Sequence, residues 1–209
     1  VAGSPRLAEV RKEPHPQYNR ARHWHTDHSY DQIPALGSML YAKELPKVGG
    51  DTLFAGCAAA FDTLSEGMKS TLRSLRAVHS SRHVFGKSAA IPDDMADLFG
   101  NADKALQDAE HPVVIKHPLS GRETLYVNPG FTTRFVGWTE KESNSLLAFL
   151  YEHISRPEHT YRFQWSKGAL AFWDNRATWH LAVNDYPGET RLMHRITICL
   201  LYTSPSPRD

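Results

Sequence analysis

Short apolar runs separated by polar turns dominate the chain and predict a fold built mainly from β-strands. The runs that predict strands are residues 38–41, 52–55, 113–115, 124–127, 161–165 and 169–173. Glycine-containing turns separate the two members of each successive pair, at residues 49–51, 118–121 and 166–168. We therefore expect each pair to be two short strands around a turn.

Two segments have helical periodicity instead. The first contains one apolar stripe at spacings of three and four residues, made of Phe61, Leu64, Met68, Leu72 and Leu75. The second is predicted to begin at Thr139, whose hydroxyl would form a capping box with Glu142. The segment from about Ser80 to Glu110 has no clear periodicity, so we expect a variable connection or a lid there.

The last predicted strand begins at Arg191 and has two different sides. Alternate residues of a strand point to opposite sides, so Arg191 and Arg195 share one side and the leucines and isoleucines share the other. One interpretation puts the arginines in solvent, and the other puts them inside a barrel-like sandwich that holds a charged ligand. A hairpin with its turn at residues 184–188 would bring this strand next to His180.

Composition limits the classes of function. The chain has 209 residues, of which 41% are hydrophobic and 11% aromatic, so it can bury a substantial core and is most simply a single catalytic domain over residues 1–209. The formal net charge of +1 favours neither nucleic acid nor a membrane surface, and no apolar run approaches the roughly 18 residues of a membrane span. We expect a small-molecule partner and leave a homo-oligomer open. Cys57 and Cys199 are too few for a disulfide framework, which predicts a reducing cytoplasm.

Both ends differ from what a complete natural chain would show. The chain begins without Met and reaches its first candidate functional residues by His25, which predicts a truncation at the N-terminus. Residues 203–209 follow a well-patterned strand abruptly, and we interpret them as a disordered or foreign tail, with an ordinary frayed terminus as the alternative.

The candidate chemistry is a metal site. On an extended strand His25 and Asp27 would point to the same side and converge on one ion, and His180 is the best candidate for a third ligand from a distant strand. Two imidazoles and one carboxylate form a facial triad, which leaves the opposite face of an octahedral iron open for substrates and dioxygen. A His-x-Asp sequence is common by chance, so this hypothesis depends on the motifs around it.

Four motifs occur in a fixed order. They are Trp24-His25-Thr26-Asp27, Gly49-Gly50-Asp51-Thr52, Trp173-Asp174-Asn175-Arg176-Ala177-Thr178-Trp179-His180 and Arg191-Leu192-Met193-His194-Arg195. Together they resemble the iron(II)- and 2-oxoglutarate-dependent dioxygenases of the taurine dioxygenase and 2,4-dichlorophenoxyacetate dioxygenase family, from about His23 to Ile198. The resemblance implies a double-stranded β-helix, a cupin-like jelly-roll that is mainly β with flanking helices.

The resemblance also implies a role for each site residue. The three candidate ligands would hold Fe(II), Thr52 would contact 2-oxoglutarate, and Arg191 would pair with its distal carboxylate. Arg195 matches an arginine that meets the anionic end of the substrate in the taurine enzyme. The implied reaction consumes O2 and 2-oxoglutarate, releases succinate and CO2, and hydroxylates a small, anionic organic substrate. If the hydroxylated carbon bears a sulfonate, sulfate ester or aryl ether, the product then loses that group.

Some residues depart from the family pattern or have two interpretations. His28 stands where the taurine enzyme has an aliphatic residue that contacts substrate, so it is either a substrate contact or an imidazole that packs at the pocket rim. This departure argues against a sulfonate substrate. His23 could join the same strand side as His25, but the triad is complete without it. Asn128 either lines the pocket or shapes a turn.

Two other functions remain open from the residues alone. A His/Asp/His site could hold zinc and activate water in a hydrolase, although such chemistry usually needs a general base and gives no reason for paired arginines. A non-enzymatic jelly-roll that binds metal or an organic anion, or an inactive fragment, is the second alternative. Succinate release that depends on added iron(II) would separate both from a dioxygenase.

Overall fold

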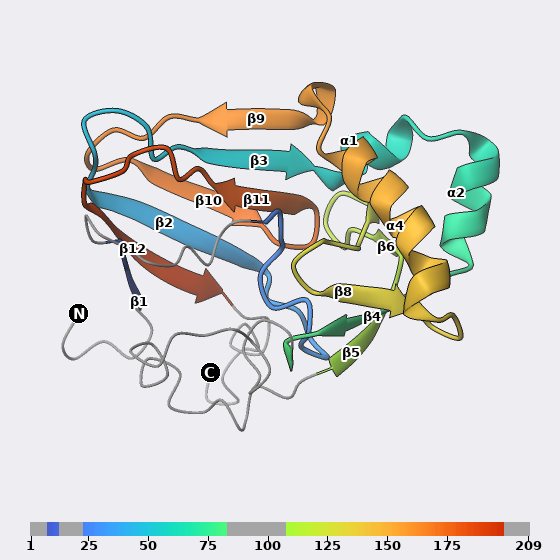
Figure 1. Ribbon diagram of the computed structural model, residues 1–209. Coiled ribbons are helices and arrows are strands. Elements are labelled where there is room, and N and C mark those ends of the chain that lie inside the picture. Colours follow the sequence, from blue (N-terminus) through green and yellow to red (C-terminus); the bar gives the residue numbers. More distant parts are fainter. Residues whose placement is uncertain (1–7, 13–22, 83–107, 199–209) are drawn as a thin grey trace, which may run out of the picture.

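The computed structural model describes residues 8–12, 23–82 and 108–198, and strands dominate this part of the chain (Figure 1). The strands are β1 (Ala8–Lys12), β2 (Gly37–Glu44), β3 (Thr52–Gly56), β4 (Arg76–Ser80), β5 (Asp108–Pro112), β6 (Val114–Lys116), β7 (Glu123–Leu125), β8 (Thr132–Phe135), β9 (Thr160–Phe163), β10 (Leu170–Asp174), β11 (Thr178–Ala182) and β12 (Arg191–Ile198). The helices are α1 (Cys57–Asp62), α2 (Glu66–Arg73), α4 (Glu140–Ile154) and the 3-10 turn η2 (Pro157–His159). None of the described helices is long and apolar enough to cross a membrane.

Three of the sequence predictions fall outside the described residues. These are the tail at residues 203–209, the thiol of Cys199 and most of the segment between Ser80 and Glu110.

Two antiparallel sheets form the sandwich that positions the candidate site. One has the strand order β1-β12-β2-β10 and the other the order β11-β3-β9. Between them lies an apolar cluster built on Leu40, Trp173 and Met193 from the first sheet, against which Phe54 and Phe163 of the second sheet pack. The described strands form separate sheets and not a closed barrel. This arrangement confirms the jelly-roll that the family resemblance implied.

Strands that follow one another in sequence often lie in different sheets. β2, β10 and β12 belong to one sheet, whereas β3, β9 and β11 belong to the other, so the turns at residues 49–51, 166–168 and 184–188 carry the chain across the sandwich. The predicted hairpin between His180 and Arg191 is therefore wrong. Turn residues fix a reversal of the chain but not whether the next strand pairs or crosses. β6 and β7 do pair with each other, so the prediction of two strands around residues 118–121 is confirmed.

The first predicted helix is two helices. α1 ends at Asp62 and α2 begins after Ser65, whose hydroxyl oxygen accepts a hydrogen bond from the Met68 amide at 3.3 Å. The apolar stripe survives this break because Phe61 and Leu72 are both buried in the same core. The apolar periodicity alone predicted one continuous helix, but the chain starts a new helix after Ser65. The serine side chain makes this possible, because it accepts from an amide that the helix itself leaves unpaired.

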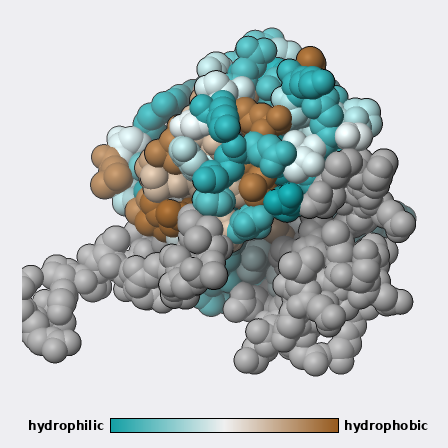
Figure 2. All heavy atoms as spheres, turned by 90° about the vertical axis from the view of Figure 1, so that its left-hand side faces the viewer, coloured by the Kyte–Doolittle hydropathy of each residue, from teal (hydrophilic) through white to brown (hydrophobic). Residues whose placement is uncertain are grey.

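The second predicted helix is confirmed in detail. The Thr139 hydroxyl accepts from the Glu142 amide at 3.2 Å, and the Glu142 carboxylate accepts from the Thr139 amide at 2.8 Å. The inner side of α4 then buries Leu150 and Ile154 in the larger apolar cluster, together with Trp179 of β11. The helices gather at one end of the sandwich (Figure 1). The opposite end faces the viewer in Figure 2, and there hydrophobic side chains lie exposed among hydrophilic ones.

Candidate metal centre

The position of His180 follows from its neighbour in β11. Trp179 is fully buried in the apolar core, where its indole N–H donates to the Val127 carbonyl oxygen at 2.8 Å. Successive side chains of a strand point to opposite sides, so His180 points away from this core and into the sandwich. There its ring packs against Trp173, with 4.8 Å between ring centroids. The core therefore fixes the direction of this imidazole.

His25 reaches the same place by pairing with β11. The His25 amide donates to the His180 carbonyl oxygen at 3.2 Å, and the His180 amide donates to the His25 carbonyl oxygen at 2.9 Å. This is an isolated bridge and not part of a longer strand, so the prediction that an extended strand carries both His25 and Asp27 is wrong. The hydroxyl of Thr26 donates to the Asn175 carbonyl oxygen at 2.5 Å, which holds the chain as it turns at Asp27.

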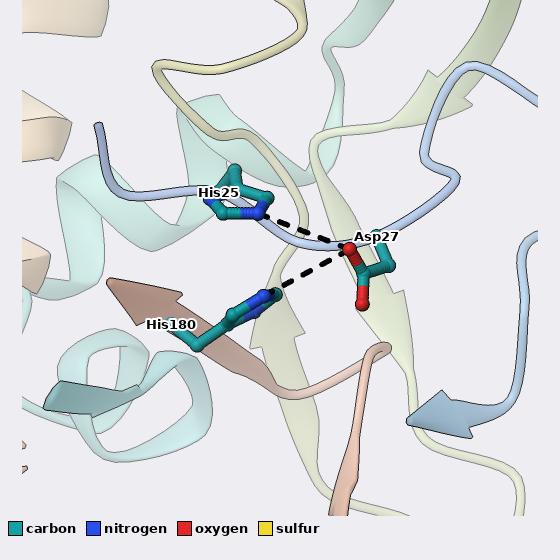
Figure 3. A group of neighbouring side chains, drawn as sticks. All are labelled: His25, Asp27 and His180. Atoms are coloured by element: carbon teal, nitrogen blue, oxygen red, sulfur yellow. Dashed lines mark ion pairs between the residues drawn. The ribbon is translucent and has the colours of Figure 1, made fainter. Parts of the chain in front are cut away.

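The three predicted ligands do meet. Their ligand atoms lie within 4.8 Å of one another, and both rings point toward the Asp27 carboxylate (Figure 3). The Nε2 atoms of His25 and His180 are each 3.8 Å from Asp27 Oδ1. His25 Nδ1 lies 2.9 Å from the His23 carbonyl oxygen, which can only accept a hydrogen bond, so Nδ1 is the donor and Nε2 is the ring nitrogen that faces Asp27. The set of donor atoms fits a divalent transition metal.

The two oxygens of the Asp27 carboxylate have different neighbours. Its Oδ1 faces the histidines, whereas Oδ2 accepts from the Ser38 hydroxyl at 2.6 Å and pairs with Arg195 Nη2 at 2.6 Å. Burial alone would raise the pKa of Asp27, but attraction to His180 and Arg195 outweighs burial and holds the pKa well below its ordinary value. The carboxyl group is therefore ionised, as a metal ligand must be.

His180 is held in the neutral form. Burial, with some repulsion from His25, lowers the pKa of His180 to about 3. A neutral imidazole has a lone pair for a metal, so no proton needs to leave before binding. The Nδ1 atom of His180 is buried and has no hydrogen-bond partner among the described residues.

A buried positive charge lies at the start of β12. Arg191 is 6% exposed, its Nε donates to the Gly50 carbonyl oxygen at 3.0 Å, and its Nη2 has no partner in the described part of the chain. Burial lowers the pKa of Arg191, and attraction to Tyr186 and Asp51 offsets this effect only in part. The arginine side of β12 therefore faces the interior, and the solvent-facing interpretation is wrong. An incoming carboxylate would supply the missing acceptor.

Trp165 connects Arg191 with the predicted cosubstrate contact Thr52. The Trp165 indole N–H donates to the Thr52 hydroxyl oxygen at 3.0 Å, and the Arg191 guanidinium lies 5.8 Å from the centre of the Trp165 ring. Neither Trp165 nor Ser38 was singled out from the sequence, because an isolated Trp or Ser has no local signal for such a role. Asn175 lies inside a recognised motif, and its amide donates to the Ser38 hydroxyl at 3.2 Å.

The remaining candidates lie at the edges of this cluster. The Nε atom of Arg195 is buried without a described partner, while its Nη2 is the atom that meets Asp27. His28 has a φ of +58°, which is uncommon for a residue with a side chain, and its Nδ1 lies 3.0 Å from Asp31 Oδ2. Asn128 shapes a turn, because its Oδ1 accepts from the Phe131 amide at 2.9 Å.

The sequence of this chain is similar to those of curated proteins over most of its length. An alkylsulfatase of Acinetobacter baylyi is 38% identical over 182 residues, which are 86% of this chain and 57% of that protein. An alpha-ketoglutarate-dependent sulfate ester dioxygenase of Pseudomonas putida is 37% identical over 186 residues, which are 87% of this chain and 61% of that protein. This chain thus spans about three fifths of the length of these curated relatives.

Solved structures give the same result. A taurine dioxygenase from Burkholderia xenovorans superposes with a TM-score of 0.78 at 34% identity, over 95% of this chain and 66% of that chain. AAD-2 in complex with Mn(II) and N-oxalylglycine superposes with a TM-score of 0.78 at 26% identity, over 92% of this chain and 73% of that one. The family model described as "Taurine catabolism dioxygenase TauD, TfdA family" matches residues 3–197, and this chain belongs to that family.

Proposed function

We propose that this chain is the catalytic domain of an iron(II)- and 2-oxoglutarate-dependent dioxygenase that hydroxylates a small organic anion and releases succinate and CO2. The observation that carries this proposal is a cluster of two imidazoles and one carboxylate in the same interior as a buried, incompletely paired arginine. A metal would account for the cluster, and an anionic ligand would give Arg191 Nη2 the acceptor that it lacks among the described residues. The family to which the chain belongs supports the same combination.

His25, Asp27 and His180 would hold the iron. Burial holds His180 neutral, and neighbouring charges hold Asp27 ionised, and these are the protonation states that metal ligands need. The hydrogen bonds from Ser38 and Arg195 to Asp27 Oδ2 leave Oδ1 as the oxygen available to the ion. When bound, Fe(II) supplies the electrons and the open coordination positions for O2 activation.

Arg191 and Thr52 would hold the cosubstrate. A planar guanidinium can bind the distal carboxylate of 2-oxoglutarate through two parallel hydrogen bonds, and Nη2 of Arg191 is the donor without a partner. The Thr52 hydroxyl already accepts from Trp165, so its own proton can be donated to a carboxylate oxygen. Because both side chains are buried, the carboxylate would bind where water competes weakly.

Arg195 and His28 would meet the anionic end of the primary substrate. We favour a sulfate ester, because the two curated relatives described above are named for sulfate ester chemistry. Arg195 would keep Asp27 in place through Nη2 and offer its unpartnered Nε to the substrate. Sulfonates and aryloxyacids are the other substrate classes to compare. The proposed partner is a small molecule, and a homo-oligomer stays open. The proposed location is a reducing cytoplasm, because Cys57 is a free thiol.

The test is succinate formation with each substrate class, with and without added iron(II). We expect succinate release that requires iron and O2 and that increases with a sulfate ester. Anaerobic addition of iron(II) and 2-oxoglutarate should also give a weak visible charge-transfer band, which zinc cannot give. Hydrolysis with zinc and without 2-oxoglutarate would point to a hydrolase. Stoichiometric iron binding with neither a band nor succinate would point to a binding protein or an inactive fragment.

A further inference from the structure

A second cation lies beside Arg191. β1 lies beside β12 (Figure 1), and Lys12, the last residue of β1, stands directly opposite Arg191, the first residue of β12, in the antiparallel ladder. Residues directly opposite each other in such a pair project to the same side of the sheet. Since Arg191 points into the interior, Lys12 lies on that side too, at the edge of the sandwich.

The contacts of Lys12 hold its ammonium close to the residues that surround Arg191. Its Nζ lies 3.7 Å from the centre of the Tyr186 ring and donates to Asn184 Oδ1. Tyr186 is buried, and Gly50 packs against both Tyr186 and Arg191. A methyl group at Gly50 would lie 3.3 Å from Tyr186 Cε1 and 3.3 Å from Arg191 Cδ. Burial and repulsion from Arg191 lower the pKa of Lys12.

The nearby carboxylates are already bound to other groups. Asp51 Oδ2 accepts from Arg162 at 2.6 Å. Asp185 pairs with Arg162 at 3.1 Å and accepts from the Gly50 amide at 2.8 Å. Asp185 still raises the pKa of Lys12, but burial and Arg191 outweigh it. Two cations on the same side of the ladder thus repel each other with incomplete compensation, which destabilises the sheet unless an anion binds between them.

We propose that Lys12 and Arg191 together clamp the distal carboxylate of the cosubstrate, so that β1 is part of the 2-oxoglutarate site. Arg191 supplies the directed hydrogen bonds and Lys12 supplies a second charge at the edge. Cosubstrate binding should then stabilise the pairing of β1 with β12. This inference rests on the proposed function, because it needs a dicarboxylate in the pocket.

The experiment measures binding and not turnover. Calorimetry follows N-oxalylglycine, a redox-inert analogue with a distal carboxylate, as it binds the Mn²⁺-loaded full chain. Lys12→Met keeps the apolar stem and loses the charge, and Lys12→Gln keeps a donor for Asn184. Both should weaken N-oxalylglycine about fivefold, and Lys12→Arg should bind within about twofold of the unmodified chain. Pyruvate, which lacks the distal carboxylate, should bind equally to all three variants.

Arg11→Met is the matched control. It removes the same charge from the neighbouring position of β1, whose side chain points to the other side of the sheet. An equal loss in Arg11→Met and Lys12→Met would overturn the clamp in favour of a general charge effect. Unchanged binding in both neutral Lys12 variants would also overturn it, provided that Arg191→Gln weakens N-oxalylglycine strongly. If Arg191→Gln has no effect either, the cosubstrate site of the proposed function is wrong as well.

Discussion

Two buried regions of this chain differ in how well their polar atoms are paired. Beneath α4 the core is apolar, and the indole N–H of Trp179 there is hydrogen-bonded. Between the two sheets lie ionised and polar side chains, and four buried nitrogens there have no described partner: Nε1 of Trp173, Nδ1 of His180, Nε of Arg195 and Nη2 of Arg191.

This difference suggests that the core beneath α4 serves stability and the space between the sheets serves function. Burial of apolar side chains stabilises the fold, whereas a buried polar group without a partner costs free energy. Between the sheets a bound metal or anion could satisfy such groups. The core beneath α4 therefore holds the sandwich in shape, and the space between the sheets keeps polar atoms ready for a metal and an anion.

The largest expected effect is on turnover. His25→Ala, Asp27→Ala and His180→Ala should each abolish iron-dependent succinate formation, because the loss of one ligand from three removes the geometry that leaves the opposite face of the metal open. His194→Ala is the control, since His194 lies on β12 but points to the side opposite Arg191 and Arg195. Full activity in any one of the three variants would show that the triad is wrongly chosen.

A substitution in the apolar core should lower stability and leave metal binding unchanged. Leu150 is fully buried, so Leu150→Ala should lower the free energy of unfolding by about 3 kcal/mol, measured by urea denaturation without metal. Leu170→Ala, at a leucine that is 55% exposed, should change it by less than about 0.5 kcal/mol. The folded Leu150→Ala protein should bind iron normally. A large loss of iron affinity would mean that the two regions are not separable.

Arg191 should strengthen cosubstrate binding without stabilising the metal-free fold. Arg191→Ala should weaken 2-oxoglutarate by roughly 2 kcal/mol, about 30-fold, because the distal carboxylate loses its partner in a buried pocket. The metal-free fold should keep or gain stability, since an incompletely paired buried charge is removed. Arg195→Ala should instead affect the primary substrate more than the cosubstrate. Equal and small effects of both variants on the 2-oxoglutarate dependence of succinate formation would contradict this division.

A smaller effect concerns pH. Burial and repulsion from His111 lower the pKa of His79 from 6.5 to about 3. Below pH 6.5 His79 is therefore protonated in the unfolded chain but not in the folded chain. The free energy of unfolding is highest above pH 6.5 and decreases as the pH falls toward 3. His79→Asn should remove on the order of 1 kcal/mol of the pH dependence of unfolding between pH 6.5 and 5, measured without metal. An unchanged slope would show that His79 can be protonated in the fold.

Local patterns in the sequence were sufficient for features that depend on nearby residues. The capping box at Thr139, the pairing of β6 with β7 and the shared side of Arg191 and Arg195 all follow from spacings of a few residues. The order of four motifs was sufficient for the family and its jelly-roll fold. The residue types of the triad were also visible, because metal-binding atoms occur in only a few side chains.

Tertiary structure decided which distant segments meet. Turn residues before Arg191 predicted a hairpin, but the chain crosses to the other sheet there, and His180 pairs with His25 instead. Alternation showed that the two arginines share a side, but only packing showed that this side is the interior, where Arg195 meets Asp27. The register that puts Lys12 opposite Arg191 joins strands from the two ends of the described chain. Such contacts depend on how whole sheets bury their surfaces, and no short stretch of sequence contains that information.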